Sequence, residues 1–347
     1  MHILVLASGS GGHVYPALSF VNKATQHKIT YLRIKNGFES KILDDSLPYL
    51  DVKNQLKSYI KHPREFFKLR KEIKRNKDVL KEVDAIVCFG GFVSFIGLII
   101  SLMYNKPLYL HEQNKTLGDA NKIAQFHARK IFVCFESSIL NPKNKKYMFV
   151  GNPRMDEVKG NKHDHLGFNV LFFAGSLSSS SLNNIVKELL EKNIPSKINF
   201  YVITGEKQFK EFSSLKKNNV HILSYQKDMI SLMRNMDLVI MRAGATSISE
   251  VIAFNLPAIL IPSPNVKHNH QYENAYELAK SNAAILIEEK DCTSEKLYKE
   301  IEVLFKDYTQ YLVIKNNLKK FYKEDVCKNM LKVINNERLW TIRKLWC

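Results

Sequence analysis

The sequence has few cysteines, and they do not form a recognisable motif. Five cysteines are scattered over 347 residues with no C-x-x-C pair, which argues against a structural zinc site and a disulfide framework and fits a reducing compartment. Long hydrophobic runs are also missing. The longest, residues 92–104, has 13 residues, whereas a membrane-spanning helix needs about 20. We therefore expect a buried or surface-docked helix there. The N-terminus has no basic segment or cleavage site, so we expect no signal peptide.

Acidic residues are scarce relative to basic ones. The chain has 34 Asp and Glu against 52 Lys and Arg, a formal net charge of +18, of which +12 falls in residues 1–150 and +6 in residues 151–347. The excess is concentrated between Lys53 and Lys81, where 11 basic residues face 3 acidic ones. This asymmetry indicates an anionic partner for the first half: nucleic acid, an anionic membrane surface or a phosphorylated substrate. A lysine-rich background spread over solvated surfaces is the alternative.

Two common nucleotide-binding motifs are absent. A G-x-G-x-x-G fingerprint begins at Gly9 and Gly11 but fails at Val14, no acidic residue follows near Arg33, and no G-x-x-x-x-G-K-[ST] occurs. A nicotinamide enzyme and a P-loop NTPase are therefore disfavoured. What remains is a glycine turn between an apolar strand and a helix, which can bind an anion. His13 follows this turn, either in the site or as a cap or packing residue.

Apolar strand-like runs alternate with helical stretches and then restart, which predicts an α/β protein with parallel sheets covered on both faces. The expected strands are 2–7, 29–34, 84–89, 107–111 and 130–135, then 169–174, 198–204, 220–224, 237–241, 257–261 and 284–287, with the first helix over about 14–25. A Gly-, Asn- and Pro-containing segment at 151–168 is the expected linker. We predict two doubly wound, Rossmann-like domains, residues 1–153 and 154–327, facing across a cleft, with a C-terminal helix at about 328–347 packed back on the first.

Polar side chains follow several of these strands. The run His111-Glu112-Gln113-Asn114 ends one strand, where four polar groups are costly to bury unless they bind something, and a polyhydroxylated ligand suits them better than a metal. Residues 242–250 repeat the strand, small-residue loop and helix layout. There Ser247 and Glu250 fit a capping box. The alternative is that the backbone N–H groups of residues 243–246 bind a diphosphate and that Glu250 binds a ribose. Gln271 and Asn274 share a helix face if a helix starts there, and their amides suit sugar hydroxyls.

Segments in a fixed order carry a family resemblance. They are Gly9-Ser10-Gly11-Gly12-His13-Val14-Tyr15-Pro16-Ala17-Leu18, Gly90-Gly91-Phe92-Val93-Ser94, His111 to Asn114, Gly118 to Asn121, Gly151-Asn152-Pro153, Ala174-Gly175-Ser176 with Leu182-Asn183, Arg242 to Glu250, and Gln271-Tyr272 with Asn274-Ala275. Together, over roughly residues 2–290, the chain resembles the MurG family, the peptidoglycan N-acetylglucosaminyltransferases of the two-domain GT-B fold. Two departures are Arg154 directly after Pro153 and fewer glycines at Ala174 to Ser179.

The resemblance implies transfer of GlcNAc from UDP-GlcNAc to the MurNAc C4 hydroxyl of undecaprenyl-pyrophosphoryl-MurNAc-pentapeptide (lipid I), giving lipid II. It implies that UDP-GlcNAc is bound by Ser10, Gly11, Gly12, Asn114, Arg154, Ser176, Tyr225, Gln226, Met229, Arg242, Gly244, Ala245, Thr246, Glu250, Gln271 and Asn274. On the acceptor side it implies Gly9, Ser10, Gly11, Gly12, His13, Gly90, Gly91 and Asn121. Attack by a hydroxyl needs a base, for which His13 is the first choice and Glu112 the second.

The sequence offers no DxD-like pair to hold a metal at the donor, so we expect inverting transfer that requires no cofactor. Residues 58–75 mix apolar and basic side chains, and residues 339–347 form a second such segment, which suits an anionic leaflet. We therefore expect a peripheral protein on the cytoplasmic side of the cell membrane, with no nucleic-acid partner. The alternatives are another GT-B enzyme acting on UDP-GlcNAc (a 2-epimerase or a glycolipid glycosyltransferase), a basic nucleic-acid-binding protein, and a sugar-nucleotide binder without turnover.

Overall fold

The computed structural model describes residues 1–44, 46–53, 63–158, 167–174, 179–212, 215 and 217–345, with side chains for all of these except 63–65 and 338–345. The chain divides into two units: Met1–Glu157 with Lys323–Cys347, and Val158–Tyr322. The first boundary follows Glu157 and the second follows Tyr322. The boundaries predicted from the sequence follow residues 153 and 327 instead. The segment after Tyr322 belongs to unit 1.

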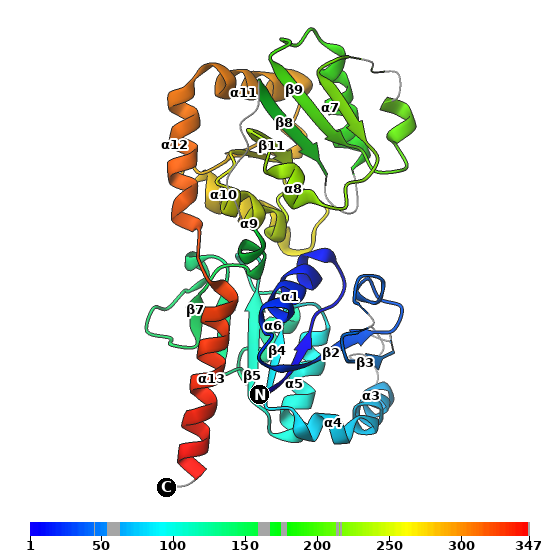
Figure 1. Cartoon of the computed structure of the whole chain (residues 1–347), viewed down its shortest axis with the longest axis vertical. Helices are drawn as coiled ribbons and strands as arrows, with labels where there is room; N and C mark the ends of the chain where they lie inside the picture. Colours follow the sequence, from blue (N-terminus) through cyan, green and yellow to red (C-terminus); the bar gives the residue numbers. More distant parts are fainter. Residues whose placement is uncertain are drawn as a thin grey trace. The chain divides into compact units, whose positions relative to one another are not determined.

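Unit 1 is an α/β unit whose described strands form one parallel sheet in the order β3-β2-β1-β4-β5-β6-β7. The strands are β1 (His2–Leu6), β2 (Lys28–Ile34), β3 (Tyr49–Val52), β4 (Ala85–Cys88), β5 (Leu108–Glu112), β6 (Lys130–Val133) and β7 (Tyr147–Phe149). The helices are α1 (Gly11–Lys23), α3 (Pro63–Arg75), α4 (Lys77–Glu82), α5 (Val93–Tyr104), α6 (Asp119–Ala124) and α13 (Val326–Leu345) (Figure 1).

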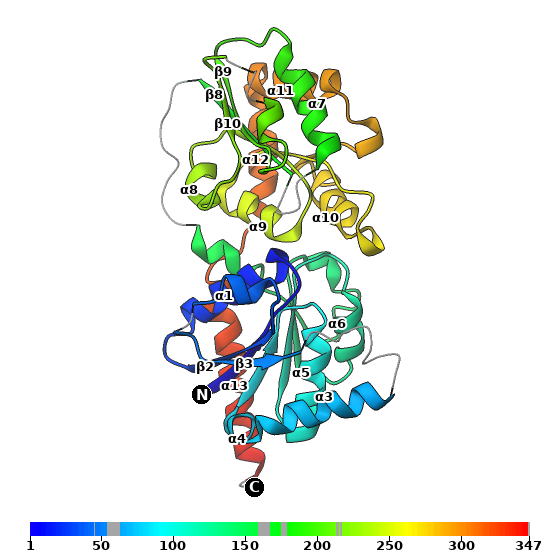
Figure 2. The ribbon, with the colours of Figure 1, turned by 90° about the vertical axis from the view of Figure 1, so that its right-hand side faces the viewer.

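Helices cover both faces of this sheet, which explains its continuous apolar strands. Figure 2 shows α1 and α13 on one side and α5 and α6 on the other. Every residue of β1 is buried, as expected for a strand in the middle of a doubly wound sheet. The apolar run 92–104 forms α5, whose inward side chains are buried in the core. Among the described residues, no helix is both long and apolar enough to cross a membrane.

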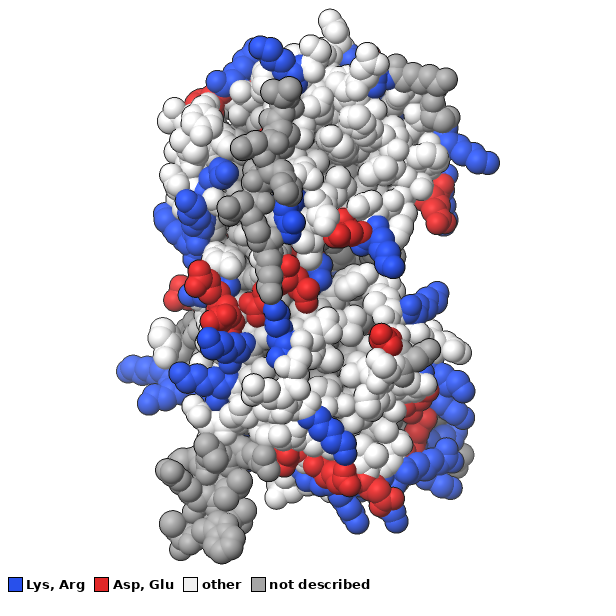
Figure 3. Space-filling view, viewed as in Figure 1, with Lys and Arg blue, Asp and Glu red and all other residues white. Residues whose placement is uncertain are grey.

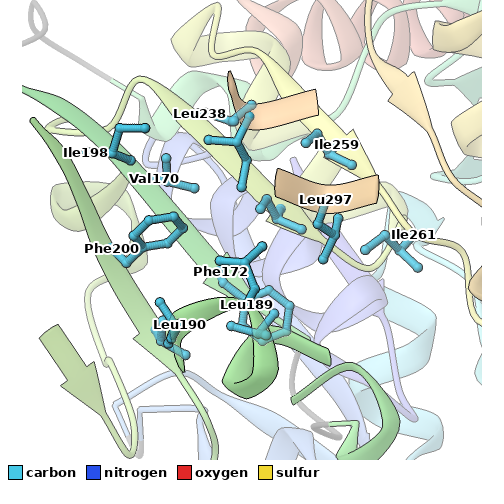
Figure 4. Close-up of a cluster of buried hydrophobic side chains, with 14 of the residues drawn as sticks. Val170, Phe172, Leu189, Leu190, Ile198, Phe200, Leu238, Ile259, Ile261 and Leu297 are labelled. Carbon is cyan, nitrogen blue, oxygen red and sulfur yellow. The ribbon is translucent and has the colours of Figure 1, made fainter. Parts of the chain in front are cut away.

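Unit 2 repeats this architecture, and its described strands form a parallel sheet in the order β10-β9-β8-β11-β12-β13. The strands are β8 (Phe168–Phe173), β9 (Ile198–Ile203), β10 (Val220–Leu223), β11 (Leu238–Met241), β12 (Ala258–Leu260) and β13 (Ile285–Leu286). The helices are α7 (Ser180–Glu191), α8 (Met229–Met233), α9 (Ala245–Phe254), α10 (His270–Ala279), α11 (Ser294–Lys306) and α12 (Tyr308–Leu318). Figure 4 shows part of its core, a cluster that includes Phe172 and Phe200 of the sheet, Leu189 of α7 and Leu297 of α11.

The fold class is confirmed, and the differences from the predicted elements lie at edges and helix starts. Strands β3 and β7, which the sequence analysis does not predict, are the two edge strands of the unit 1 sheet. Their burial is only partial, so they lack the continuous apolar pattern of central strands. Helix α1 begins at Gly11, not near residue 14. Both glycines after Ser10 therefore belong to the first turn of the helix.

Candidate functional site

The predicted acceptor loops of unit 1 lie where the strand order of the sheet reverses. Strands β1 and β4 are neighbours, with β2 and β5 on their outer sides, and ligands of doubly wound sheets bind at the carboxyl ends of such strands. Gly9 (φ +99°), Gly90 (φ +92°) and Gly91 (φ +74°) have left-handed backbones, which favour glycine. A Cβ on Gly91 would lie 2.6 Å from the Ser8 carbonyl oxygen. The two loops therefore pack backbone against backbone.

His13 stands in the first turn of α1, against the second of these loops. Its backbone N–H donates to the Ser10 carbonyl (3.1 Å), and its Nδ1 lies 3.0 Å from Gln113 Oε1. A Cβ on Gly90 would lie only 2.7 Å from His13 Nδ1, so the imidazole ring rests on the Gly90 backbone. Around it, Gly9 and Ser10 are exposed, Gly12 is half-buried and Gly11 is buried. The structure thus brings the predicted acceptor-side glycines and His13 together.

Glu112, the second candidate base, is buried with both carboxylate oxygens occupied. It is 2% exposed. Its Oε1 accepts from the Asn114 backbone N–H (3.1 Å) and side-chain Nδ2 (3.2 Å), and its Oε2 accepts from the Gly118 N–H and Asn121 Nδ2, both at 2.9 Å. The carboxylate fixes the loop between β5 and α6. Asn121, predicted on the acceptor side, is itself 1% exposed and supports this loop.

The sequence interpretation of residues 111–114 as ligand-binding groups is wrong for the first three, which hydrogen-bond to groups of the protein itself. His111, Glu112 and Gln113 are each at most 2% exposed. Burial lowers the pKa of His111 to about 4, so this ring is neutral at pH 7. Its Nε2 bonds the Gly151 carbonyl oxygen at 3.0 Å. Asn114 is half-buried and is the member of the run nearest to solvent.

Arg154, predicted to contact the nucleotide, lies against helix α1 of its own unit. Its guanidinium carbon is 5.4 Å from the centroid of the Tyr15 ring, within the range of a cation–π contact. Its backbone N–H donates to Asn152 Oδ1 at 3.0 Å. The contact is made within unit 1, in the segment η3 (Pro153–Glu157).

In unit 2, Arg242 joins the carboxyl ends of neighbouring strands. Its guanidinium pairs with Glu289 Oε2 (2.8 Å) and donates to Ser179 Oγ (2.8 Å) and to the carbonyls of Ile261 and Pro262 (3.3 and 3.2 Å). Pairing with Arg242 lowers the pKa of Glu289. Arg242, predicted as a donor ligand, is therefore held by protein acceptors and braces the loops after β11 and β12 against the N-cap of α7.

Helix α9 presents an open N-terminus after β11. Gly244 is its N-cap, and a Cβ placed there would meet no atom of the described residues within 4 Å. Ala245 and Thr246 form the first turn, and Glu250, 7% exposed, lies one turn further on. The capping-box interpretation is wrong, because the helix begins before Ser247 instead of after it. Backbone N–H groups at such a terminus attract an anion.

Helix α10 carries the two predicted amide ligands, which differ in exposure. Gln271 is half-buried, and its Oε1 accepts from the Ser263 N–H (2.8 Å). Asn274 is fully buried, and its Nδ2 donates to the Ala243 carbonyl at 3.3 Å. Asn274 thus supports the turn that leads into α9, while Gln271 lies closer to solvent.

The remaining predicted donor residues lie near α8 or outside the described part of the chain. Tyr225 is 66% exposed, Gln226 donates to the Asp228 carbonyl (2.9 Å), and Met229 begins α8. Ser176 lies outside the described residues. Among those described, no group of three His, Cys, Asp or Glu side chains is placed to hold a metal ion.

Several residues hold the predicted site residues in place, a role that the sequence does not predict for them. Gln113, His111 and Glu289 all bind a predicted site residue or its neighbours. The polar run at 111–114 is a sequence signal for the first two. Glu289 has no such signal, because it lies 47 residues after its partner Arg242 in an unremarkable Glu-Glu-Lys-Asp segment.

Family models match both units. The glycosyltransferase family 28 N-terminal domain matches residues 3–133, and the glycosyltransferase family 28 C-terminal domain matches residues 169–330. The structure is also similar to the crystal structure of Acinetobacter baumannii MurG, with a TM-score of 0.79 and 23% identity over 96% of this chain and 99% of that one. At this level of sequence identity, the structural similarity establishes the fold alone.

Curated relatives are similar over most of their length. A Halalkalibacterium halodurans protein named UDP-N-acetylglucosamine--N-acetylmuramyl-(pentapeptide) pyrophosphoryl-undecaprenol N-acetylglucosamine transferase is 32% identical, covering 87% of this chain and 90% of the relative. A relative of the same name from Bacillus pumilus is 31% identical with the same coverage. The chain belongs to glycosyltransferase family 28 and, within it, to the MurG family.

Proposed function

We propose that this chain transfers GlcNAc from UDP-GlcNAc to the MurNAc C4 hydroxyl of lipid I, giving lipid II for peptidoglycan synthesis. The similarity to curated relatives named for this transfer, over most of both chains, carries the proposal. In the reaction the C4 oxygen attacks the anomeric carbon, the bond from that carbon to the UDP oxygen breaks, and the hydroxyl proton passes to a base. UDP leaves with the bonding electrons, and the configuration inverts.

His13 is the proposed base, and Glu112 is the proposed positioning residue. His13 is half-buried beside exposed loop residues, so its ring can reach both solvent and a bound hydroxyl. Glu112 accepts four hydrogen bonds from N–H groups, which leaves little capacity for a substrate proton. Its effect on transfer would come through the position of Asn114.

The open N-terminus of α9 is the proposed diphosphate site. The N–H groups of its first turn would compensate the charge on the leaving UDP, and we propose that the transfer proceeds without a divalent metal. Glu250 would bind the ribose, and Gln271, the more exposed of the two amides on α10, a sugar hydroxyl. Arg242 and Asn274 would hold these groups in place instead of touching the donor.

We also propose that unit 1 contacts an anionic membrane surface through α3. Its side chains Leu69 and Ile73 are buried, whereas Phe67 is 65% exposed. Among the described side chains of the helix, the exposed cations are Lys68, Arg70, Lys71, Lys74 and Arg75. Figure 3 shows Lys and Arg side chains over α3 and α4, with Asp and Glu among them. Of the predicted membrane segments, residues 58–62 and the side chains of 339–347 lie outside the described residues.

The proposed location is the cytoplasmic side of the membrane. The four described cysteines, Cys88, Cys134, Cys292 and Cys327, are free and buried, which fits a reducing compartment.

The transfer is tested with the purified chain, radiolabelled UDP-GlcNAc and a lipid I analogue, with and without EDTA. We expect a disaccharide-lipid product in both conditions, and a loss of ~10²–10⁴-fold in kcat for His13→Ala. Turnover of UDP-GlcNAc without the acceptor would indicate an epimerase instead. Loss of activity in EDTA that Mg²⁺ restores would contradict the metal-independent transfer, and a His13→Ala protein with near-normal kcat would contradict the base.

A further inference from the structure

A chain of hydrogen bonds connects the half-buried His13 to two backbone carbonyls. Gln113 Oε1 lies 3.0 Å from His13 Nδ1, and Gln113 Nε2 lies 2.8 Å from the Phe89 carbonyl oxygen and 3.1 Å from His111 Nδ1. His111 Nε2 lies 3.0 Å from the Gly151 carbonyl oxygen. Gln113 and His111 are 1% and 0% exposed, so their bonds to each other and to the two carbonyls are made inside the protein.

The two carbonyls determine the direction of every bond in this chain. A carbonyl oxygen only accepts hydrogen bonds, so the group of Gln113 that faces Phe89 is its NH₂, and Oε1 faces His13. At the other end, the Gly151 carbonyl requires a proton on His111 Nε2. The neutral ring of His111 then has a lone pair on Nδ1, which accepts the second N–H of Gln113. The Phe89 carbonyl and the His111 ring therefore both place the NH₂ group of Gln113 on the side away from His13.

The protonation of the His13 ring follows from the same rule. An amide oxygen accepts hydrogen bonds and cannot donate one, so the nitrogen that faces Gln113 Oε1 carries a proton. A neutral imidazole has one N–H, and Nε2 of His13 therefore has the lone pair. The base that the mechanism needs is that nitrogen, since Nδ1 is occupied.

We propose that Gln113 is a positioning residue that fixes His13 in the Nδ1–H tautomer and thereby makes Nε2 the proton acceptor of the transfer. The inference rests on the proposed function for the role of His13, but the tautomer itself does not depend on it. His111 contributes to this arrangement, because its Nδ1 lone pair and the Phe89 carbonyl together hold the Gln113 amide in one orientation.

Gly90 restricts the position of the His13 ring, as Gln113 restricts its protonation. A Cβ there would lie 2.7 Å from His13 Nδ1, 2.8 Å from its Cε1 and 3.4 Å from Gln113 Oε1. The ring and the amide therefore meet in contact with the backbone of the β4–α5 loop. The imidazole is held by a hydrogen bond on its Nδ1 side and by this packing at its edge.

The tautomer is measured by ¹⁵N NMR of the full chain labelled at histidine, at a pH where His13 is neutral and without substrate. We expect the His13 signals to show a protonated Nδ1 and an unprotonated Nε2. In Gln113→Met, which has a similar volume and no acceptor in this place, we expect the proton to move to Nε2, the form that an unconstrained imidazole favours. In Gln113→Glu, whose carboxyl keeps an oxygen toward His13, we expect the Nδ1–H form to return.

Activity gives the second readout. Gln113→Met is expected to lower kcat ~10²-fold or more with little change in KM, because the base would then present a proton instead of a lone pair. Gln113→Glu is expected to recover part of that loss and to move the acidic limb of the kcat/KM profile to higher pH, since a carboxylate beside the ring favours imidazolium. The matched control is Gln125→Met on the same unit, where Gln125 donates to the Lys122 carbonyl outside this chain of bonds. It should leave the His13 tautomer and kcat unchanged.

A wild-type His13 protonated on Nε2 would overturn the proposal, as would an Nδ1–H tautomer that persists in Gln113→Met. These NMR outcomes need no turnover, so they are separate from a failure of the proposed function, in which no lipid-linked product would form. If Gln113→Met does not fold, the wild-type spectrum still decides the question.

Discussion

At the scale of the residue, His111 links the site to the stability of the fold. It is fully buried, and burial lowers its pKa to about 4, whereas an unfolded histidine titrates near 6.5. The fold therefore favours the neutral ring, which is also the form that the hydrogen bonds to Gly151 and Gln113 require. Stability then depends on pH between these two pKa values.

The free energy of unfolding is expected to fall as the pH is lowered from 6.5 toward 4. In this window the unfolded state binds a proton that the folded His111 does not, so the contribution is present above pH 6.5 and lost as the pH approaches 4. Its upper limit is roughly 3.5 kcal/mol, since the pKa falls from 6.5 to about 4 and each unit corresponds to about 1.4 kcal/mol. Urea unfolding at several pH values measures it. His111→Gln, which cannot titrate, should show a flatter pH dependence, and equal slopes for the two proteins would contradict the assignment.

The sequence identifies the place of this site but not the partners within it. The glycine turn before His13 and the polar run at 111–114 can be recognised because each follows an apolar strand. Whether a polar group at a strand end faces a ligand or the neighbouring loop depends on contacts between distant segments. Glu112 and Asn121 are such a case, and so are Arg242 and Glu289, because nothing local to either residue indicates its partner.

At the scale of the element, central strands and helices with strong apolar patterns are predictable from the sequence, and edges are not. Strands β3 and β7 each have one neighbour in the described sheet, so their side chains are only partly buried. The start of α13 is also difficult to predict from the sequence, because it is determined by a side chain far away in the chain. Asp156 of η3 accepts from the N–H groups of Val326 (3.0 Å) and Cys327 (2.8 Å).

Asp156 is expected to stabilise the first turn of α13. It satisfies two N–H groups that have no acceptor within the helix, and a carboxylate is favourable at a helix N-terminus. Asp156→Ala should cost ~1–2 kcal/mol and increase hydrogen exchange of the amides near Val326 and Cys327. The matched control is Asp307→Ala, which removes the cap of α12 in unit 2 and should affect α12 alone. Unchanged exchange at the start of α13 in Asp156→Ala would contradict the cap.

At the scale of the whole molecule, the charge is distributed unequally between the two parts of the sequence. Residues 1–150 carry +12 of the net +18, and the described side chains of α3 include five exposed cations next to the exposed Phe67. Leu69 and Ile73 of this helix are buried in the unit 1 core, and Phe66 packs against it. A helix anchored on one face, with cations and an aromatic ring on the other, is typical of a membrane-surface contact.

Neutralising three of these cations, with Arg70, Lys71 and Lys74 each replaced by Gln, is expected to weaken binding to vesicles that contain anionic lipid. Each basic side chain near such a surface contributes about 1 kcal/mol, so the three together predict about 100-fold weaker binding. Sedimentation with vesicles at low salt measures it, and added salt should weaken the wild type toward the variant because it screens the attraction. The control replaces Lys207, Lys210 and Lys299, exposed on unit 2, which changes the net charge equally and should leave binding nearly intact. Equal weakening by both triple variants would show that net charge acts and not α3, and transfer to a soluble acceptor analogue should be unchanged in both.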